Sequence, residues 1–469
     1  MRRPVVWRIV IVVRQPVGGW VLSSPAAAVS ATPNRLHIGW GIGTLGASTL
    51  LNSFAALQLY YLTDVLGVAI ATASLVLFAA KIWDWIANPL MGLISDRTHT
   101  RWGRRRPYLI LGGVISGFAF AVFFSSALTP VSQSLVLVTL SLALVGTGYT
   151  IFNVPYMAMP SELVDDYKER TRMISVRVFC IGIGTMIGIS TQRLAEILGG
   201  DAEGYAQMGL IVGVFVFFFM ALTFFGTAGG RQHARETQRV PLAEQLRTGL
   251  ANKPFAALLG TKFTQLFGLF TSTAMSIFVV KYVLGKENPG EWMIYFTAVS
   301  FIGQTLSIPM WTWITNKVEK RAAYMLSTAA FCLMSLTWLV ASPQEAIYIF
   351  LLRALLKGFA AGGLLLLGQS MLPDTIEYDY RRTGLRREGV FSGLYSVVEK
   401  VASSFAPTLL GLGYAWFGFQ SKAPVQTTEA IDGIRYCAAF LPCFYFGISL
   451  IPLWFYRLDE KTLKSAQRA

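Results

Sequence analysis

Long apolar stretches separated by short polar segments run through the whole chain. Each stretch reaches roughly 20 residues, the length that an α-helix needs to cross the hydrocarbon core of a bilayer. Twelve such stretches occur, at residues 37–63, 70–95, 107–128, 133–159, 173–198, 206–228, 255–284, 291–315, 322–341, 345–372, 389–417 and 433–456. The pattern predicts an all-α membrane protein with twelve transmembrane helices.

Basic residues concentrate in alternate connections between these stretches. The segments that follow the second, fourth, sixth, eighth and tenth stretches each carry at least three Lys or Arg residues. The intervening segments are nearly free of charge: 126–134 has none, and 199–205 has only Asp201 and Glu203. Because basic loops stay in the cytoplasm, we expect the basic connections and both termini to be cytoplasmic.

The composition agrees with a membrane protein. Hydrophobic residues make up 54% of the chain and charged residues 14%, whereas a soluble domain carries about 25% charged residues. The net charge of +15 would suggest nucleic-acid binding in a soluble protein. Here the basic residues lie in the short connections, so the expected partner is the lipid bilayer and not nucleic acid. The four cysteines show no Cys-x-x-Cys spacing, and we expect no structural metal site.

A short charged motif occurs twice. Asp166 lies six residues after Pro160, and Asp379 lies six residues after Pro373, each followed by a tyrosine. The two copies follow the fourth and the tenth apolar stretches. Equivalent motifs after equivalent stretches predict two six-helix halves related by a pseudo-repeat, the plan of the major facilitator fold, in which substrate binds between the halves.

This repeat also predicts the domain organisation. We expect a first six-helix half at 37–229 and a second at 255–457. A cytoplasmic connector at 230–254, with a short amphipathic surface helix, joins them. The segment 1–36 is expected to be a disordered extension, and 458–469 a cytoplasmic tail.

Charged side chains within the second stretch are candidate functional residues. Lys81, Asp84 and Asn88 are spaced three and four residues apart, so they share one helix face. Lys81 can neutralise Asp84 as a purely structural pair. Alternatively, Asp84 and Asn88 provide oxygens for a small cation, or Asp84 alone carries a proton. We favour a functional role because an ion pair in lipid gives little net stability.

Other polar residues within the apolar stretches admit two interpretations. Thr150 and Asn153 share a helix face, where they either line a cavity or form interhelical hydrogen bonds. Arg177 lies within the fifth stretch. Glu399 and Lys400 are adjacent, so they point about 100° apart, and which of them faces the cavity is left open.

Three further basic residues are expected at helix ends or between helices. These are Lys262, Arg353 and Lys357. The three histidines lie at the ends of stretches or in connections, which argues against a histidine proton relay. No nucleotide-binding loop, zinc motif or catalytic triad is recognisable, so a membrane-embedded enzyme or sensor is disfavoured and an ion gradient is expected to drive transport.

Several motifs together resemble a known family. The chain is similar over 37–456 to the glycoside–pentoside–hexuronide:cation symporters of the major facilitator superfamily. The motifs that carry the resemblance are Tyr60-Tyr61-Leu-Thr-Asp64-Val-Leu-Gly67, Ile82-Trp83-Asp84, Asn88-Pro89, Gly92-x-x-x-Asp96-Arg97, Asn153-Val-Pro155-Tyr156, Glu169-Arg170-Thr171 and Arg387-Glu388-Gly389.

The resemblance implies roles for individual residues. It implies a cation or proton site at Asp84, Asn88 and Thr150, with Lys81 as a charge partner. From its place beside Lys400, we also expect Glu399 to be a charge partner. The implied substrate site contains Tyr149, Asn153, Tyr156, Arg177 and Lys400. The implied cytoplasmic gate contains Asp96, Arg97, Arg104, Arg105, Asp166, Arg170 and Asp379.

Departures from the family pattern change the expected substrate and ion. The family's second cation-site aspartate is replaced by Asn88, and its sugar-binding aspartate by Asn153. A single carboxylate makes coupling to a proton, or uncoupled transport, more plausible. Fixed positive charge at Arg177 and Lys400 suits an anionic substrate such as a hexuronide better than a neutral galactoside.

The sequence therefore predicts a secondary transporter. It would move a sugar, glycoside or hexuronide by symport with Na⁺ or H⁺, without another cofactor, as a monomer in a bacterial-type inner membrane. A transporter of amphiphilic lipids or drugs on the same fold is the alternative.

Overall fold

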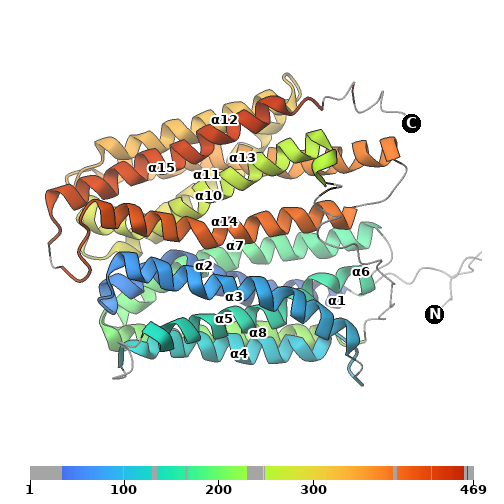
Figure 1. Ribbon diagram of the computed structural model, residues 1–469, viewed down its shortest axis with the longest axis horizontal. Helices are drawn as coiled ribbons and strands as arrows, with labels where there is room; N and C mark the ends of the chain where they lie inside the picture. Colours follow the sequence, from blue (N-terminus) through green and yellow to red (C-terminus); the bar gives the residue numbers. More distant parts are fainter. Residues whose placement is uncertain are drawn as a thin grey trace, which may run out of the picture.

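The protein is built from long helices that run roughly side by side (Figure 1). The computed structural model describes residues 34–98, 100–128, 135–163, 167–229, 247, 249–383, 388–423, 425–458 and 462. The expected extension at 1–36 therefore lies almost entirely outside the described residues. So do most of the connector and most of the tail.

Twelve of the described helices are long. In the first half they are α2 (Gly43–Tyr60), α3 (Ile70–Arg97), α4 (Arg106–Ser125), α5 (Leu135–Ala158), α7 (Tyr167–Ile197) and α8 (Ala202–Gly226). In the second half they are α10 (Lys253–Phe278), α11 (Pro289–Thr315), α12 (Lys320–Leu336), α13 (Ile347–Thr383), α14 (Glu388–Trp416) and α15 (Thr428–Phe455). The short helices α1 (Asn34–Gly41) and α6 (Pro160–Leu163) flank α2 and α7. The predicted all-α membrane architecture is confirmed.

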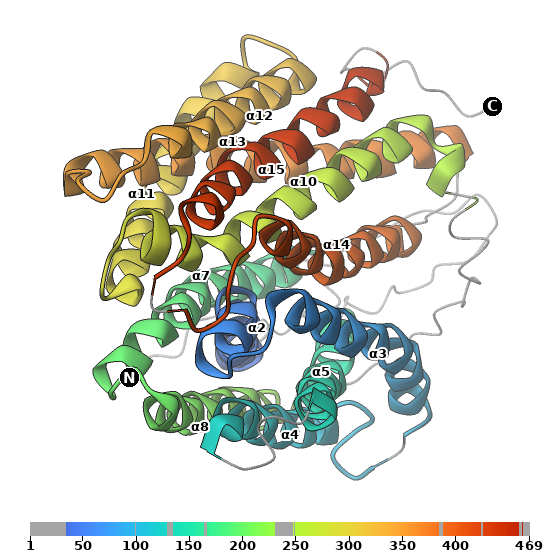
Figure 2. The same cartoon turned by 60° about the vertical axis from the view of Figure 1, so that its left-hand side comes forward.

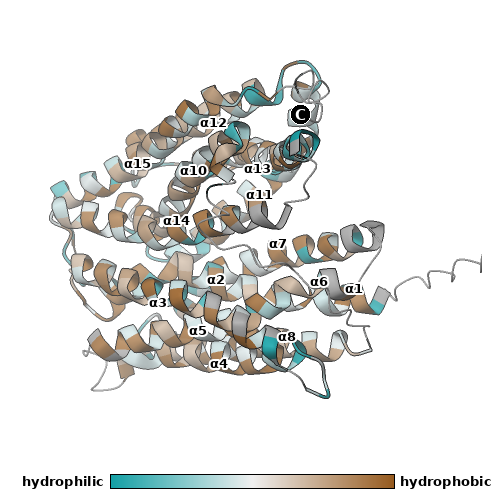
Figure 3. Ribbon diagram, turned by 45° about the vertical axis from the view of Figure 1, so that its right-hand side comes forward, coloured by the Kyte–Doolittle hydropathy of each residue, from teal (hydrophilic) through white to brown (hydrophobic). Residues whose placement is uncertain are grey.

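Ten of the described helices are long and apolar enough to cross a membrane by themselves. The other two long helices, α2 and α14, are more polar, since α2 carries several hydroxyl and amide side chains and α14 carries Glu399 and Lys400. Most of α2 is buried inside the protein, so it does not need an apolar surface all round. Hydrophobic residues extend along the helices, and hydrophilic ones gather mainly at their ends (Figure 3).

The predicted end of the tenth stretch is wrong. The tenth apolar stretch was expected to end at residue 372, but α13 continues through Pro373 to Thr383. Proline removes one backbone donor and bends a helix without necessarily ending it. Two ion pairs support the extension: Lys320 Nζ lies 2.6 Å from Asp374, and Arg381 Nε lies 2.7 Å from Glu377. Charge pattern alone suggested a loop because this part of the helix lies beyond the apolar core.

The two ends of the helical body differ in charge. The end at which α1 begins and α15 ends also carries the Lys- and Arg-rich connections, and we call it the basic end (Figure 1). The opposite end, with the connections at 66–69, 198–201, 284–288, 341–346 and 417–427, is called the distal end. The halves meet where α2 packs on α10, α3 on α14 and α7 on α11 (Figure 2).

A π-helical turn ends the first long helix of each half. Residues Tyr61–Val65 continue α2, and Val279–Val283 continue α10. Each turn leads into a glycine with positive φ, +77° at Gly67 and +60° at Gly285, a conformation that glycine adopts at little cost. Such single π-helical turns are rare and often occur at functional sites. The two halves therefore share a special backbone feature at the distal end.

Backbones of the two halves approach closely at the distal end. A Cβ atom added to Gly290 of α11 would lie 2.5 Å from the backbone nitrogen of Arg193 in α7. Real atoms do not come so close, so only glycine fits this contact. The same end is joined by a hydrogen bond from Ser421 Oγ to the carbonyl oxygen of Val68, at 2.7 Å.

Replacing Gly290 by alanine should separate the halves at the distal end. The added methyl group meets backbone, which cannot rotate away. A short bifunctional thiol reagent that joins cysteines placed at Val68 and Ser421 measures this closure, and we expect a clear loss of cross-linking in Gly290→Ala. Gly413→Ala is the matched control, since its Cβ would meet only Cys437 Sγ at an ordinary 3.6 Å. Equal cross-linking in the two variants would contradict the expectation.

Candidate functional site

Asp84 lies near the middle of α3 and faces the interior of the protein. Its Oδ2 atom lies 3.2 Å from Lys81 Nζ, one turn earlier on the same helix. Its Oδ1 atom is buried and has no hydrogen-bond partner among the described residues. This oxygen packs against Gly146 of α5, where an added Cβ would lie only 1.9 Å away. The carboxylate therefore has one oxygen paired and one oxygen free to bind a proton or cation.

A small cavity adjoins this carboxylate. It measures about 50 Å³ and lies between α2, α3 and α5, enough for a few water molecules. Its polar lining residues are Gln58, Lys81, Asp84 and Tyr149, and the rest of its lining is apolar. The Asp84 side chain keeps 19% of its surface exposed. Asp84 is therefore neither sealed against a neighbouring helix nor directed at lipid.

The other two residues of the predicted cation site, Asn88 and Thr150, do not line this cavity. The amide of Asn88 donates a hydrogen bond to the backbone carbonyl of Asp84, not to its carboxylate. Thr150 is buried on α5, but it does not line the cavity beside its neighbour Tyr149. In the described structure, the carboxylate, Gln58 and Tyr149 are the oxygen-bearing side chains at this cavity.

Charged residues of the second half lie opposite Asp84. Lys400 of α14 is close enough to interact electrostatically with Asp84 and with its own neighbour Glu399. Glu399 in turn interacts with Lys262 of α10, whose amine lies 5.5 Å from the centre of the Tyr395 ring. Both residues therefore reach the central region: Lys400 interacts with Asp84, and Glu399 interacts with Lys262 of α10 and with Tyr149 of α5.

Arg177 and Tyr149 complete this group from the first half. Tyr149 interacts electrostatically with Glu399, Arg177 and Asp84, so all four lie around one central region. Arg177 Nε is buried without a hydrogen-bond partner among the described residues. We call these seven residues the central cluster: Lys81, Asp84, Tyr149, Arg177, Lys262, Glu399 and Lys400. Asn153, one turn beyond Tyr149 on α5, is partly buried.

Tyr156 is occupied by structural contacts. Its ring stacks on Trp40 with centroids 4.6 Å apart, and its hydroxyl donates a hydrogen bond of 3.0 Å to the Trp40 carbonyl. The same hydroxyl contacts Thr44, and the Trp40 indole donates to the Tyr156 carbonyl at 3.1 Å. These contacts fix α5 against α1 and α2, and Tyr156 is therefore not part of the central cluster.

The predicted cytoplasmic-gate residues lie at the basic end. Arg97 ends α3 and is exposed, whereas Arg105 and Asp379 are buried. Arg104 is half-buried in the connection between α3 and α4. Asp166 and the side chains of Asp96 and Arg170 lie outside the described residues. Nearby, Arg106 donates a 2.7 Å hydrogen bond to the Phe224 carbonyl, which ties α4 to the end of α8.

A second ionic group, at the distal end, was not predicted. Asp64 Oδ1 lies 2.7 Å from Lys281 Nζ and also accepts a hydrogen bond from the Tyr282 hydroxyl. Lys281 further donates to the Tyr60 hydroxyl at 2.9 Å, and Thr63 donates to Asp64 Oδ2 at 2.8 Å. The Asp64 side chain is only 3% exposed. We call Tyr60, Thr63, Asp64, Lys281 and Tyr282 the distal lock. It joins the two halves through their π-helical turns.

Two further polar contacts surround the lock. The guanidinium of Arg193 in α7 lies 3.1 Å from Glu291 in α11. Glu196 accepts a 2.7 Å hydrogen bond from the backbone nitrogen of Gly290. Hydrogen bonds and ion pairs between the described parts of the two halves thus gather at the distal end.

The sequence contained a signal for the lock. Val65-Leu66-Gly67 in the first half is repeated as Val283-Leu284-Gly285 in the second. When the two triplets are aligned in sequence, Asp64 corresponds to Tyr282, and Lys281 is the residue before Tyr282. The motif around Asp64 was used only as a mark of family resemblance, so its pairing across the halves was missed.

Twelve long helices in two halves, with charged side chains gathered between them, define a secondary transporter of the major facilitator type. The sequence profile of a family described as MFS/sugar transport protein matches residues 39–460. The chain therefore belongs to this family of sugar and glycoside symporters. It is a transporter and not an enzyme.

Similar proteins have names that agree with this assignment. A putative glycoside/cation symporter, YagG, of Escherichia coli is 24% identical, over 92% of this chain and 93% of that protein. A glucuronide carrier protein homolog of the same organism is 25% identical, over 92% and 94%. An isoprimeverose transporter of Lactiplantibacillus pentosus is 23% identical, over 93% of both.

Solved structures show the same fold. A bacterial homologue of the human lysosomal transporter Spinster, described as inward-facing and unoccupied, superposes with a TM-score of 0.67 at 15% identity. The superposition covers 94% of this chain and all of that one. The nucleoside transporter NupG gives a TM-score of 0.62 at 12% identity, over 90% of this chain and 100% of NupG.

Replacing Lys281 by methionine should open the distal end. Asp64 would remain buried without its charge partner, which costs about 3–5 kcal/mol, so states in which Asp64 reaches water become favoured. A cysteine at the buried position Ser74, in a background without native cysteines, reports this opening through alkylation by a membrane-impermeant maleimide. Lys286→Met is the matched control because Lys286 contacts only its own half, at the Pro343 carbonyl and the Trp292 ring, among the described residues. Unchanged alkylation in Lys281→Met would refute this role of the lock.

Proposed function

We propose that this protein carries an acidic sugar or glycoside into the cell together with protons, by alternating access between its two halves. The substrate would bind at the central cluster, and Asp84 would carry the coupling proton. Opening at one end and closure at the other would then expose the cluster to each side of the membrane in turn.

The orientation in the membrane follows from charge. The connections at the basic end carry the Lys and Arg clusters, so we place this end in the cytoplasm. The distal lock and the contact at Gly290 hold the halves together at the outer end. In this proposal, closure of the distal end corresponds to the state that releases substrate inside.

The free oxygen of Asp84 is the observation that carries the coupling proposal. A carboxylate within a membrane is costly, and such residues commonly serve in proton or ion pathways. Asp84 Oδ1 is buried without a hydrogen-bond partner among the described residues, and it lies beside a cavity large enough for water molecules. Protonation of this oxygen removes the charge, whereas the ionised carboxylate pairs with Lys81 and lies near Lys400.

The oxygen count at the cavity favours a proton over Na⁺. A dehydrated metal cation needs several oxygen ligands, and the cavity offers Asp84, Gln58 and Tyr149. Lys81 already occupies one carboxylate oxygen, and its positive charge repels a metal ion. A proton requires only the single free oxygen.

An acidic substrate suits the charge of the central cluster. The cluster contains four cationic side chains and two carboxylates. Arg177 has no ion pair with a described residue, and its guanidinium presents donors suited to a sugar carboxylate. This excess of positive charge supports a uronide more than a neutral sugar.

Asp84→Asn should abolish accumulation and spare exchange. A gradient of one pH unit amounts to about 1.4 kcal/mol per proton, which balances about a tenfold concentration ratio. Proteoliposomes of the wild type should therefore accumulate labelled glucuronate about tenfold, whereas Asp84→Asn should only equilibrate it. Counterflow, which needs no net proton movement, should persist.

Asp432→Asn is the control for this variant, because Asp432 pairs with Arg435 at the distal end of α15. Accumulation that survives intact in Asp84→Asn would disprove the coupling role of Asp84. If accumulation depends on a sodium gradient and not on the pH gradient, the coupling ion is Na⁺ and not the proton.

We expect Arg177→Gln and Lys400→Gln to lower the apparent affinity for acidic substrates more than that for neutral ones. Each variant removes one positive charge while retaining hydrogen-bonding capacity. We expect the apparent affinity for methyl glucuronide to fall at least about tenfold, about 1.4 kcal/mol, while that for methyl glucoside changes little. Lys320→Gln, which lies at the basic end beside Asp374, is the control. Equal losses for both sugars would remove the argument for an acidic substrate.

A further inference from the structure

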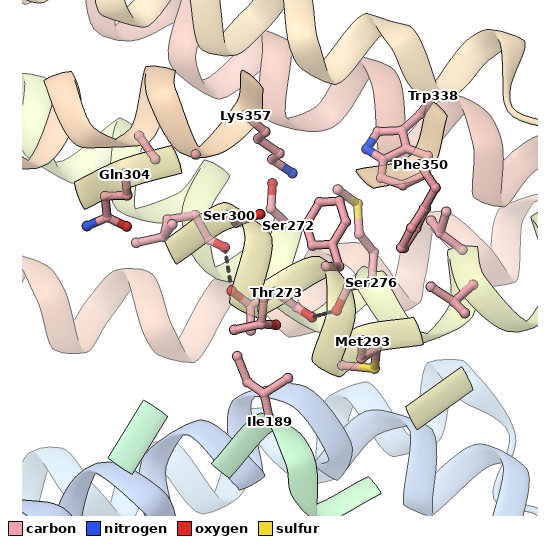
Figure 4. A pocket seen from close by; sticks show the side chains of 18 of the residues that line it. Ile189, Ser272, Thr273, Ser276, Met293, Ser300, Gln304, Trp338, Phe350 and Lys357 are labelled. Atoms are coloured by element: carbon pink, nitrogen blue, oxygen red, sulfur yellow. Dashed lines mark hydrogen bonds between the residues drawn. The ribbon is translucent and has the colours of Figure 1, made fainter. Parts of the chain in front are cut away.

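A second cavity, larger than the one at Asp84, lies within the second half. It measures about 200 Å³ and lies between α10, α11, α12 and α13, with Ile189 of α7 covering one side (Figure 4). Its walls are mainly apolar and aromatic. They include Met275, Met293, Phe296, Phe331, Trp338 and Phe350. None of the described lining residues is acidic.

Lys357 of α13 directs its amine into this cavity (Figure 4). The sequence suggested a helix-end or an interhelical position, and the place of Lys357 well inside α13 contradicts the first alternative. The amine lies 5.2 Å from the centre of the Phe331 ring and 5.8 Å from that of Phe296. Within the described part of the chain it has neither an ion pair nor a hydrogen bond, so three donors are left to solvent or to a ligand.

The carboxylate of Glu345 is already neutralised by a neighbour of Lys357. Arg353, one turn before Lys357 on α13, binds both oxygens of Glu345, at 2.7 and 2.9 Å. Arg353 also donates to Thr337 at 3.0 Å and lies 4.5 Å from the centre of the Trp338 ring. Glu345 therefore balances Arg353, and the positive charge of Lys357 is left for the cavity. Cation–π contacts offset only part of the cost of this charge.

Polar groups lie beside the amine on one side of the cavity. Ser272 Oγ is buried and has no hydrogen-bond partner among the described residues. Ser276 and Ser300 use their hydroxyl hydrogens on backbone carbonyls, at 2.7 and 3.0 Å, so their lone pairs remain available. The side chain of Gln304 also lines the cavity. The cavity thus combines one positive charge, a few hydroxyls and an aromatic wall.

We propose that this cavity binds a small amphiphile with a single anionic group. The anionic group would pair with Lys357 and accept from Ser272, and its apolar or aromatic body would pack on Phe296, Phe331 and Trp338. The cavity is smaller than the roughly 300–1,000 Å³ of typical ligand pockets. This limits the occupant to an aromatic acid or a short fatty acid.

Ile189 links this cavity to the movement of the halves. It is the lining residue contributed by the first half among those described, so separation of the halves would uncover the cavity on that side. A bound acid would therefore favour the closed distal end. This second site does not depend on the proposed function, since it involves neither the central cluster nor its substrate.

Binding of radiolabelled 4-phenylbutyrate to the purified full-length protein tests this site. Its neutral amide, 4-phenylbutyramide, is the matched competitor. We expect the acid to compete much better than the amide on the wild type. Lys357→Gln should weaken acid binding about thirtyfold or more, the loss that follows removal of one partner of a buried charge pair, while Lys357→Arg should retain it.

Lys317→Gln is the control variant. Lys317 also lies over an aromatic ring, that of Trp313 at 4.1 Å, but at the exposed basic end. Ala361→Leu fills the cavity while keeping Lys357, and it should reduce binding of acid and amide alike. It also tests the site should Lys357→Gln fail to fold. Equal competition by acid and amide, or full binding to Lys357→Gln or Ala361→Leu, would overturn the proposal.

Mass spectrometry of the purified protein distinguishes the two sources of such an acid. A fatty acid that co-purifies with the wild type, leaves on addition of 4-phenylbutyrate and is missing from Lys357→Gln would identify the bilayer as the source. Binding of 4-phenylbutyrate to a protein that retains no fatty acid would identify a soluble acid. Either result supports the site, and a protein that shows neither binding nor a retained acid would refute it.

Discussion

The cost of a charge inside a bilayer governs this structure more than any other constraint. An ionised side chain at the membrane centre costs several kcal/mol unless it meets an opposite charge, water or an aromatic face. Arg353 meets Glu345, and Lys81 meets Asp84. Lys357 has aromatic faces instead of a counterion among the described residues. The residues whose charge is incompletely balanced are therefore those that need a ligand, a proton or a conformational change, and they mark the proposed sites.

Local features of the molecule were predictable from the sequence, and tertiary ones were not. Helix positions followed from apolar length, since each span must cover the same bilayer thickness. The Lys81–Asp84 pair followed from spacing on one helix. By contrast, Asn88 shares that face but binds the backbone, and Tyr156 packs on Trp40. Such choices depend on neighbouring helices, which the spacing of residues within one helix does not reveal.

Contacts between the halves were the hardest part to foresee. Asp64 and Lys281 lie 217 positions apart, and Glu196 and Gly290 lie 94 apart. Asp64 lies just before one copy of the Val-Leu-Gly repeat and Lys281 just before the other, so internal symmetry is the signal that relates them. The repeat used for the prediction, around Asp166, marks equivalent helices at the basic end. It identifies the halves but carries no information about which surfaces of them touch.

Closure of the distal end and the charge balance at the centre are mechanically connected. Thr408 of α14 donates a hydrogen bond to the carbonyl of Ser74 in α3, where the halves touch. Asp84 follows Ser74 by ten residues, about 15 Å along the helix, and Lys400 precedes Thr408 by eight. Since α3 and α14 are stiff, separating them at Ser74 also moves Lys400 away from Asp84. Proton binding to Asp84 weakens the same attraction. In the proposed mechanism, protonation and distal opening therefore favour each other, which is the linkage that a proton symporter requires.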